Sequence, residues 1–319
     1  MKRLNWKLMF ALPLAMATLA SCDPDEDNGV DKSYPTENIT LSKTQNVYVA
    51  ELTAVDCGSC TPTREIMEVM KAQNPGRIVP ISLHADTLYV EAADAVGAAL
   101  GIDQSNPQLL FLNQVQVGVG VNPFEELNAM IEANLPPSII VGHATKEVDS
   151  AWLVYPKVEF YTDLQGDYYI QSYILMSNIE AKPYGSIDLT QASGDPRISA
   201  GTNGAPTTWT ADGGKVDSAT FLFGPGDIYM HEDVLLAAGV NDTNVYGIPL
   251  STISPLGAKY FIGDVFGTKY TPMEIVIPKP DFDMPAYLNA DLKVVTIIWE
   301  KFAGSPDVYA YINGYYSEF

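Results

Sequence analysis

Two of the three cysteines in this chain are separated only by Gly58 and Ser59, and their types and spacing suit redox chemistry. An apolar run at residues 46–53 precedes Cys57, and helix-forming sequence follows Cys60, so the pair is predicted between a strand and the start of a helix. At such a position, unpaired backbone N–H groups and the helix dipole both favour a thiolate. Because the thiolate is the form that attacks disulfides, this spacing predicts thiol–disulfide exchange, with Cys57 as the attacking and Cys60 as the resolving thiol.

Two other interpretations of the cysteine pair stay open. In an oxidising compartment the pair can form a structural disulfide that takes no part in exchange. Metal binding is disfavoured, because zinc needs four ligands and the sequence has neither a second CxxC nor an HxxxH pair. His84, His143 and His231 are far apart in the sequence, and each is expected to be an ordinary surface or packed histidine. The sequence therefore predicts no metal and no other cofactor.

The elements predicted around the cysteines alternate between strands and helices. Short apolar strands are predicted at residues 46–53, 77–83, 108–112 and 115–119, and helices at residues 62–71, 88–100 and 123–135. The order is strand, helix, strand, helix, strand, strand, helix. It predicts one parallel βαβ unit followed by a ββα hairpin unit.

This order, together with the sequences NPQLLFLN, VQVGVG and EELNAMIEANL, resembles the thioredoxin family. The resemblance implies that Pro107 is a cis proline that packs against the dithiol, and that Asn106 contacts the extended chain of a substrate protein. It also matches Glu51 to a buried carboxylate below the active site. Desolvation would raise the pKa of such an acid, which could then carry a proton to or from the second thiol. The alternative for Glu51 is a strand-edge glutamate that faces water.

The sequence departs from the thioredoxin pattern beside the cysteines. Asp56 occupies the position of the usual tryptophan, and its carboxylate disfavours the Cys57 thiolate. Gly58 and Ser59 replace the familiar glycine–proline pair. The resemblance therefore does not imply a particular reduction potential.

The second half of the chain has a different texture. From Pro136 on, short segments rich in Val, Ile, Tyr and Phe alternate with turn signals, which predicts an all-β sandwich, jelly-roll-like domain. Its many tyrosines are expected to pack across strands, with an aromatic face for carbohydrate or peptide as the alternative. His231, Glu232 and Asp233 are neighbours in a predicted strand, and their side chains would point to opposite faces, which argues against a metal site.

The N-terminus reads as an export signal. Cations within the first seven residues precede an apolar run at residues 8–19 that is too short to span a bilayer comfortably. The sequence LASC at residues 19–22 resembles the lipobox of bacterial lipoproteins, which implies that Cys22 becomes the lipidated first residue of the mature protein. An ordinary cleaved signal with an incidental cysteine is the alternative. The acidic and polar residues that follow, to about Lys43, predict a disordered tether.

Charge narrows the choice of partners. The chain carries a net charge of −21, and loss of the first 21 residues, which hold three cations and no acid, makes it −24. Such a surface repels nucleic acid, so no nucleic-acid binding is predicted. The expected partners are a membrane, through the lipid on Cys22, and protein clients or a redox partner.

A lipobox, a CxxC domain and the sequences IYMHEDVLLAAG and NADLKVVTIIWEKFAGSPDVYAYINGYY together resemble a Bacteroidetes outer-membrane lipoprotein family, first described at twenty-eight kilodaltons. Acidic residues directly after Cys22 also resemble the surface-export signal of Bacteroidetes-type lipoproteins, whereas in enterobacteria an aspartate there favours inner-membrane retention. The resemblance implies a cell-envelope, outer-membrane lipoprotein that is periplasmic or surface-exposed. The chain departs from the family at Thr53-Ala54, where Thr-Gly is common, and at Pro62, which comes one residue late.

Four segments are therefore predicted. They are a signal peptide (1–21), an acidic tether (22–44), an α/β thioredoxin-like domain (45–136) and an all-β sandwich domain (137–319). The predicted function is thiol–disulfide exchange on extracytoplasmic clients. The alternative is a non-catalytic binding or adhesion lipoprotein in which Cys57 and Cys60 form a static bridge.

Overall fold

The computed structural model describes residues 34–41, 43–57, 60–99, 109–117, 121–133, 136–190, 229–239, 246–280, 289–303 and 309–319. All of these belong to one compact unit that extends from Tyr34 to Phe319. The unit is mostly β-sheet with few helices, which confirms the predicted β-rich character of the second half. Cys22, Asn106 and Pro107 lie outside the described residues.

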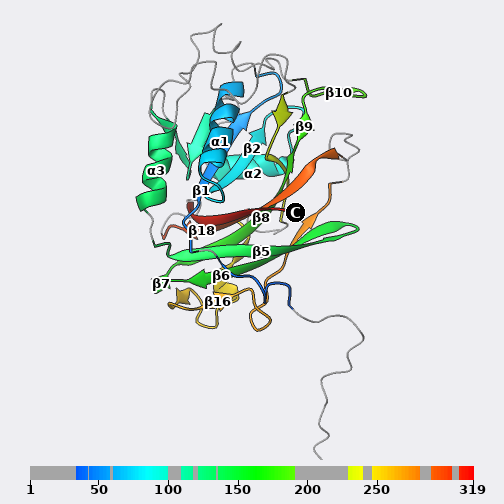
Figure 1. Cartoon of the computed structure of the whole chain (residues 1–319). Coiled ribbons are helices and arrows are strands. Elements are labelled where there is room, and N and C mark those ends of the chain that lie inside the picture. The colour runs from blue at the N-terminus through cyan, green and yellow to red at the C-terminus, as the bar shows by residue number, and fades with distance from the viewer. Residues whose placement is uncertain are drawn as a thin grey trace, which may run out of the picture. The chain divides into compact units, whose positions relative to one another are not determined.

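A mixed nine-stranded sheet forms the centre of this unit (Figure 1). Its order is β19-β18-β8-β13-β2-β1-β3-β4, and β14 pairs with β8. The strands are β1 (Val47–Thr53), β2 (Ile78–His84), β3 (Leu109–Leu112), β4 (Val115–Gln116), β8 (Asp167–Ser177), β13 (Val234–Ala238), β14 (Ile248–Pro249), β18 (Asp291–Lys301) and β19 (Tyr309–Glu318). Strands β1 and β2 are parallel, whereas β3 is antiparallel to β1 and β4 is antiparallel to β3.

The two predicted segments on either side of residue 136 share this sheet. Strand β13 pairs in parallel with β2 at Val234 and Ser82, and it is antiparallel to β8. One core cluster contains Tyr48 and Ile81 from the first segment together with Tyr173 and Trp299 from the second. The edge of β2 is thus covered by a strand from the C-terminal half, which removes an exposed edge.

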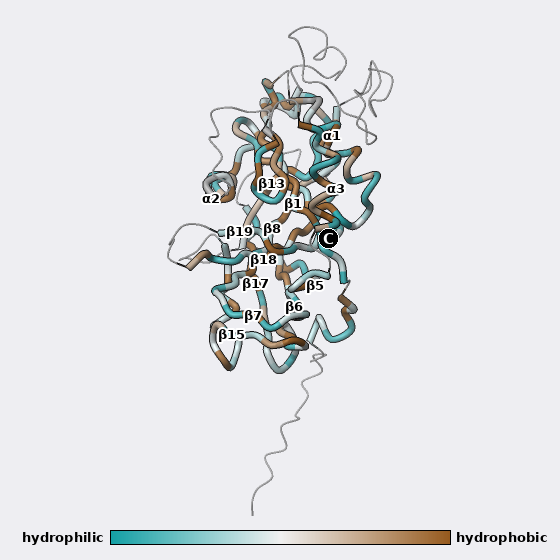
Figure 2. Tube along the Cα trace, turned by 90° about the vertical axis from the view of Figure 1, so that its left-hand side faces the viewer, coloured by the Kyte–Doolittle hydropathy of each residue, from teal (hydrophilic) through white to brown (hydrophobic). Residues whose placement is uncertain are grey.

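Three helices cover the first segment on both faces. Helices α1 (Thr61–Gln73) and α3 (Pro123–Ala133) share a core cluster with Val47 and Val49, whereas α2 (Glu91–Ala99) belongs to the cluster of Tyr48, Ala50 and Leu52. Because successive side chains of a strand point to opposite faces, β1 is buried on both sides, and its residues are apolar except for Glu51 and Thr53. Figure 2 shows the same hydrophobic character along β1 and β13.

A second sheet packs on one face of β8 and β18, opposite to the face that carries Tyr173 and Val295. Strand β6 (Ala151–Phe160) pairs with β5 (Ile139–Val148), β16 (Val265–Phe266) and β17 (Ile275–Pro278). Trp152 and Ile277 of this sheet pack against Ile174, Met176 and Val294 of the large sheet. The tyrosines at positions 168, 173, 309 and 311 are buried in these layers, which confirms the predicted packing role for them.

Part of the predicted disordered tether is ordered, and the prediction was wrong there. Thr36 is fully buried and donates a hydrogen bond to the carbonyl of Gly267. The Lys157 ammonium donates to the carbonyls of Thr36 and Ile39, at 3.2 and 2.8 Å. The residues from Tyr34 to Ile39 are thus held against the C-terminal half by hydrogen bonds and by the buried Thr36.

Candidate functional site

Cys57 and Cys60 form a disulfide between β1 and α1, with a Cα–Cα distance of 5.4 Å. Cys60 caps the N-terminus of α1, and its carbonyl accepts the N–H groups of Thr63 and Arg64 at 3.0 and 3.2 Å. The two cysteines differ in exposure, because Cys60 is 1% exposed and Cys57 is half-buried. An attacking thiolate therefore meets Cys57 before it meets Cys60.

Glu51 lies on β1 and is 1% exposed, so its carboxylate does not face water. Its Oε1 accepts a hydrogen bond from the Ser82 hydroxyl at 2.6 Å and lies 3.4 Å from a guanidinium nitrogen of Arg64. Within the part of the chain that the structure describes, Oε2 has no hydrogen-bond partner. Glu51 is thus buried in an ion pair with Arg64, and the alternative of a strand-edge glutamate that faces water does not hold.

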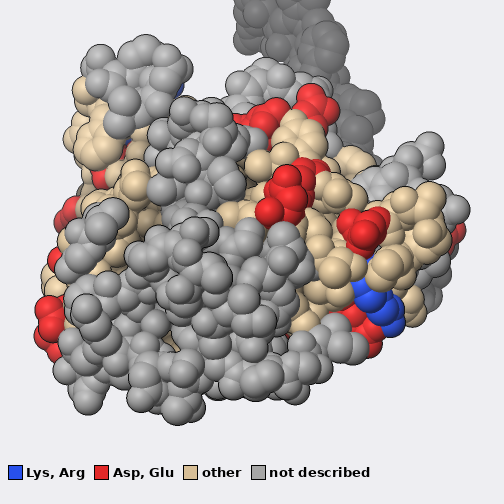
Figure 3. All heavy atoms as spheres, turned by 90° about the horizontal axis from the view of Figure 1, so that it is seen from above, with Lys and Arg blue, Asp and Glu red and all other residues tan. Residues whose placement is uncertain are grey.

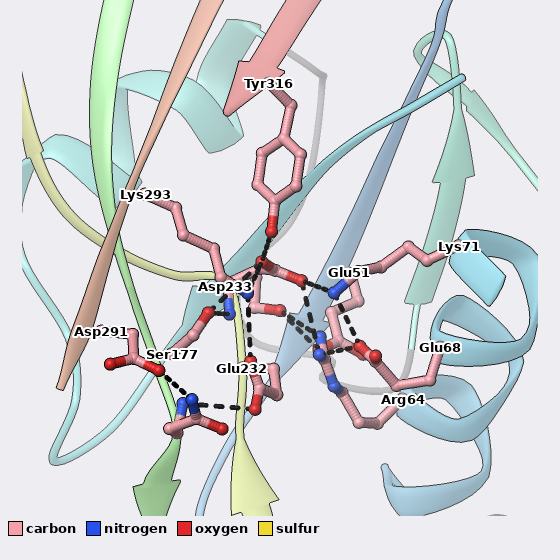
Figure 4. A network of polar contacts seen from close by, with 12 residues as sticks. Glu51, Arg64, Glu68, Lys71, Ser177, Glu232, Asp233, Asp291, Lys293 and Tyr316 are labelled. Carbon is pink, nitrogen blue, oxygen red and sulfur yellow. Dashed lines mark hydrogen bonds and ion pairs between the residues drawn. The ribbon is translucent and has the colours of Figure 1, made fainter. Parts of the chain in front are cut away.

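Arg64 stands at the centre of a buried network of charges (Figure 4). It follows Cys60 by one helical turn, is 1% exposed, and contacts the carboxylates of Glu51, Glu68 and Asp233. Burial by itself disfavours the charged guanidinium, but these carboxylates outweigh it and raise the pKa of Arg64 well above its ordinary value. The guanidinium is therefore a permanent positive charge on the first turn of α1, the helix that Cys60 caps.

Asp233 joins this network from the residue before β13 and is fully buried. Its carboxylate lies 2.5 Å from the Lys71 ammonium, 3.4 Å from Arg64 and 3.5 Å from Lys293, and it accepts a hydrogen bond from the Tyr316 hydroxyl at 2.9 Å. Burial raises the pKa of Asp233, but the three cations more than offset it and hold the pKa well below its usual range. The network thus connects α1 to strands from the C-terminal half.

A pair of buried histidines lies near the turn that leads to Cys57. The rings of His84 and His231 meet edge to face with centroids 5.5 Å apart, and His84 Nδ1 lies 3.3 Å from an Asp86 oxygen. The other Asp86 oxygen accepts the N–H of Val55. Burial, and then the neighbouring His84, lower the pKa of His231 to about 3. His143 packs elsewhere, between Thr296 and Ser317.

Among the described residues, no group of three or more His, Cys, Asp and Glu side chains could hold a metal ion. From the sequence, the three histidines were expected to lie apart, and no site was predicted at His231 or Asp233. The structure brings His231 to His84 and Asp233 to Arg64. No local signal could have found these contacts, because they depend on the pairing of β13 with β2.

Only some of the predicted site residues lie in the part of the chain that the structure describes. Cys57 and Cys60 are joined between β1 and α1, whereas Glu51 lies within β1 and contacts Ser82 and Arg64. Pro107 and Asn106, as well as the lipidation residue Cys22, lie outside the described residues. No described helix is both long and apolar enough to cross a membrane.

Comparisons with known proteins concern the fold. No model of a protein family matches the chain, and no curated protein matches its sequence. Among solved structures, HBP35 of Porphyromonas gingivalis is similar with a TM-score of 0.54 and 13% identity, over 88% of this chain and 77% of that chain. A protein of Agrobacterium tumefaciens has a TM-score of 0.43 and 12% identity, over 86% of this chain and 95% of that chain. At 13% identity, the likeness to HBP35 is a likeness of fold alone.

Proposed function

We propose that this protein is a thiol–disulfide exchange protein of the cell envelope, whose first half is thioredoxin-like. One observation carries the proposal: the disulfide at the start of α1 joins a half-buried Cys57 to a Cys60 that is 1% exposed. The surrounding elements support it, because α1 connects the parallel strands β1 and β2, and the antiparallel β3 and β4 lead to α3.

The chemistry follows from this difference in exposure. A client thiolate attacks the Cys57 sulfur, forms a mixed disulfide and displaces Cys60 as a thiolate. A second client thiolate then attacks the client sulfur of the mixed disulfide and displaces Cys57. The client leaves as a disulfide, and its two electrons remain with the protein as two thiols once protons are taken up. The reverse reaction begins with attack of the Cys57 thiolate on a client disulfide and ends when Cys60 closes the protein's own bond.

Other residues take supporting roles in the proposal. Glu51 is buried on β1 and paired with Arg64, and in the proposal it carries a proton to or from Cys60, as the thioredoxin resemblance implies. Pro107 and Asn106 contact the client chain, as the thioredoxin resemblance implies. A client must tolerate an acidic protein, because the chain carries a net charge of −21; on the face drawn in Figure 3, acidic side chains lie at several places among the described residues and basic ones at few.

The proposed location is the cell envelope, with the chain held to an outer membrane through a lipid on Cys22. The lipobox resemblance of residues 19–22 supports this anchor. The acidic residues directly after Cys22, which resemble the surface-export signal of Bacteroidetes-type lipoproteins, support a location at the outer membrane. Metabolic labelling with a fatty acid, compared between the natural chain and Cys22→Ser, tests the anchor.

Redox titration tests the proposed exchange activity. The chain without residues 1–22 keeps all described residues and lacks the Cys22 thiol, so that thiol trapping reports on Cys57 and Cys60 alone. A midpoint between about −120 and −270 mV is expected, since known exchange catalysts fall in that range. A midpoint below about −300 mV would mark a structural disulfide and favour the binding or adhesion alternative.

A further inference from the structure

The strongest feature that this function leaves unexplained is the buried carboxylate of Asp233. It comes from the C-terminal half of the chain, yet both of its closest charged partners, Lys71 and Arg64, lie on α1. The backbone fixes this approach, because the N–H of Ser82 in β2 donates to the Asp233 carbonyl at 2.8 Å. Asp233 therefore reaches the dithiol helix through the strand pairing of β13 with β2.

Stability alone does not explain a carboxylate in this place. Removing a charge from water is costly, and well-packed apolar residues often stabilise a fold as much as a buried ion pair does. Asp233 also has a φ of +53°, a left-handed conformation that costs free energy for a residue with a side chain. The buried charge and the left-handed backbone both cost free energy, and both occur at the residue whose carboxylate contacts α1.

Arg64 contacts Cys60 through its backbone and Asp233 through its side chain. Its N–H donates to the Cys60 carbonyl, and its guanidinium lies 3.4 Å from Glu51 on one side and 3.4 Å from Asp233 on the other (Figure 4). The guanidinium Nε has no hydrogen-bond partner within the described residues. Carboxylates and the Ser82 hydroxyl, 3.2 Å away, therefore set the orientation of Arg64.

We propose that Asp233 is a positioning residue of the dithiol site, which holds Arg64 beside Glu51 and balances the positive charge of Arg64 and Lys71, so that the C-terminal half sets the reduction potential of the Cys57–Cys60 bond. The inference deepens the proposed exchange function and rests on it. The potential itself can be measured whether or not the protein acts on clients.

The direction of the effect follows from charge. Reduction converts a neutral disulfide into a thiol pair that includes a thiolate, and positive charge nearby favours that anion. Asp233 opposes this effect, so its removal favours the reduced form. The charged and titratable groups that contact the Asp233 carboxylate are Arg64 and Lys71 of α1, Lys293 of β18 and Tyr316 of β19, and Glu232 precedes it in the chain. Glu51 of β1, Glu68 of α1, Tyr229 and His231 interact with Arg64.

Asp233→Asn is the central variant, measured by equilibrium with glutathione in the chain without residues 1–22. We expect the equilibrium to move toward the reduced form by about tenfold, which is about 30 mV for a two-electron couple. The matched control is Glu232→Gln, which removes the same charge one residue away. Glu232 contacts Lys293 and the N–H of Asn178, at 3.4 and 3.2 Å, instead of α1. The Cys57–Cys60 bond of Glu232→Gln should therefore have the same reduction potential as that of the natural chain.

Lys71→Met keeps the inference testable where Asp233→Asn does not fold. The Lys71 side chain is 17% exposed, so its loss is tolerated more readily, and it should shift the equilibrium in the opposite direction, toward the disulfide. An equilibrium constant with glutathione within about twofold of that of the natural chain, in folded Asp233→Asn or in Lys71→Met, would overturn the inference. Turnover with unchanged potentials would overturn the inference alone, whereas shifted potentials without any turnover on clients would overturn the exchange function alone.

Discussion

At the scale of single residues, the two cysteines are chemically distinct although they share one bond. Cys57 is half-buried, and Cys60 is 1% exposed beneath the first turn of α1. Thiol–disulfide exchange depends on which sulfur an incoming group can reach. The difference in exposure therefore predicts different reaction rates for the thiol that is left when either cysteine is replaced by serine.

Cys60→Ser should leave Cys57 as a lone accessible thiol that forms a lasting mixed disulfide with glutathione disulfide, because no resolving thiol remains. Cys57→Ser should form the same adduct at least about tenfold more slowly, since Cys60 is shielded. Mass spectrometry of the intact chain without residues 1–22 measures both rates. Equal rates in the two variants would show that Cys57 is not the reactive position.

At the scale of elements, α1 delivers the dithiol and is held on the sheet by its apolar side. Met67 and Met70 are fully buried in the cluster that contains Val47 and Val49 of β1. This packing, together with Pro62 near the first turn, explains why the helix begins where it does.

Met67→Ala should lower the free energy of unfolding by about 2–5 kcal/mol, because it removes buried methylene groups and leaves a cavity. Val115→Ala on β4 is the control: Val115 is 59% exposed, and its truncation should change that free energy by less than about 0.5 kcal/mol. Urea unfolding of both variants measures the difference. A loss below about 1 kcal/mol for Met67→Ala would contradict this account of α1.

At the scale of the whole unit, buried histidines make stability depend on pH. Burial lowers the pKa of His143 to about 3, and burial followed by His84 lowers that of His231 to about 3. In the unfolded chain a histidine titrates near pH 6.5. Between these values the unfolded state binds protons that the folded state does not, so stability is complete above about pH 6.5 and falls as the pH is lowered.

We expect the free energy of unfolding to fall by about 1.4 kcal/mol per pH unit for each of these histidines between about pH 6 and pH 5. His143→Gln should remove one of the two contributions and so flatten the slope, while it keeps a side chain that can bond to Thr296 and Ser317. Urea unfolding at several pH values measures the slope. An unchanged slope in His143→Gln would contradict the assignment.

The sequence by itself predicted the elements that depend on local pattern. Strands β1 and β2 and helix α1 lie within a residue or two of the predicted ranges, because their apolar spacing and Pro62 are local signals. The two cysteines that the sequence singled out by their spacing are joined in a disulfide, and exchange at this bond stays a prediction. Strand β13 was harder to predict, because a short apolar run such as residues 234–238 does not by itself distinguish a buried strand from a helix.

Only the tertiary structure decided what surrounds the cysteines. Asp233 reaches Arg64 from 169 residues away, and His231 reaches His84, because β13 pairs with β2 in a sheet that both halves share. Long-range pairing of this kind depends on which strand edge is left open after local folding, and no residue spacing encodes it. The sequence determined where the cysteine pair lies, whereas the pairing of strands from distant parts of the chain determined which charges meet Arg64 on the helix that follows it.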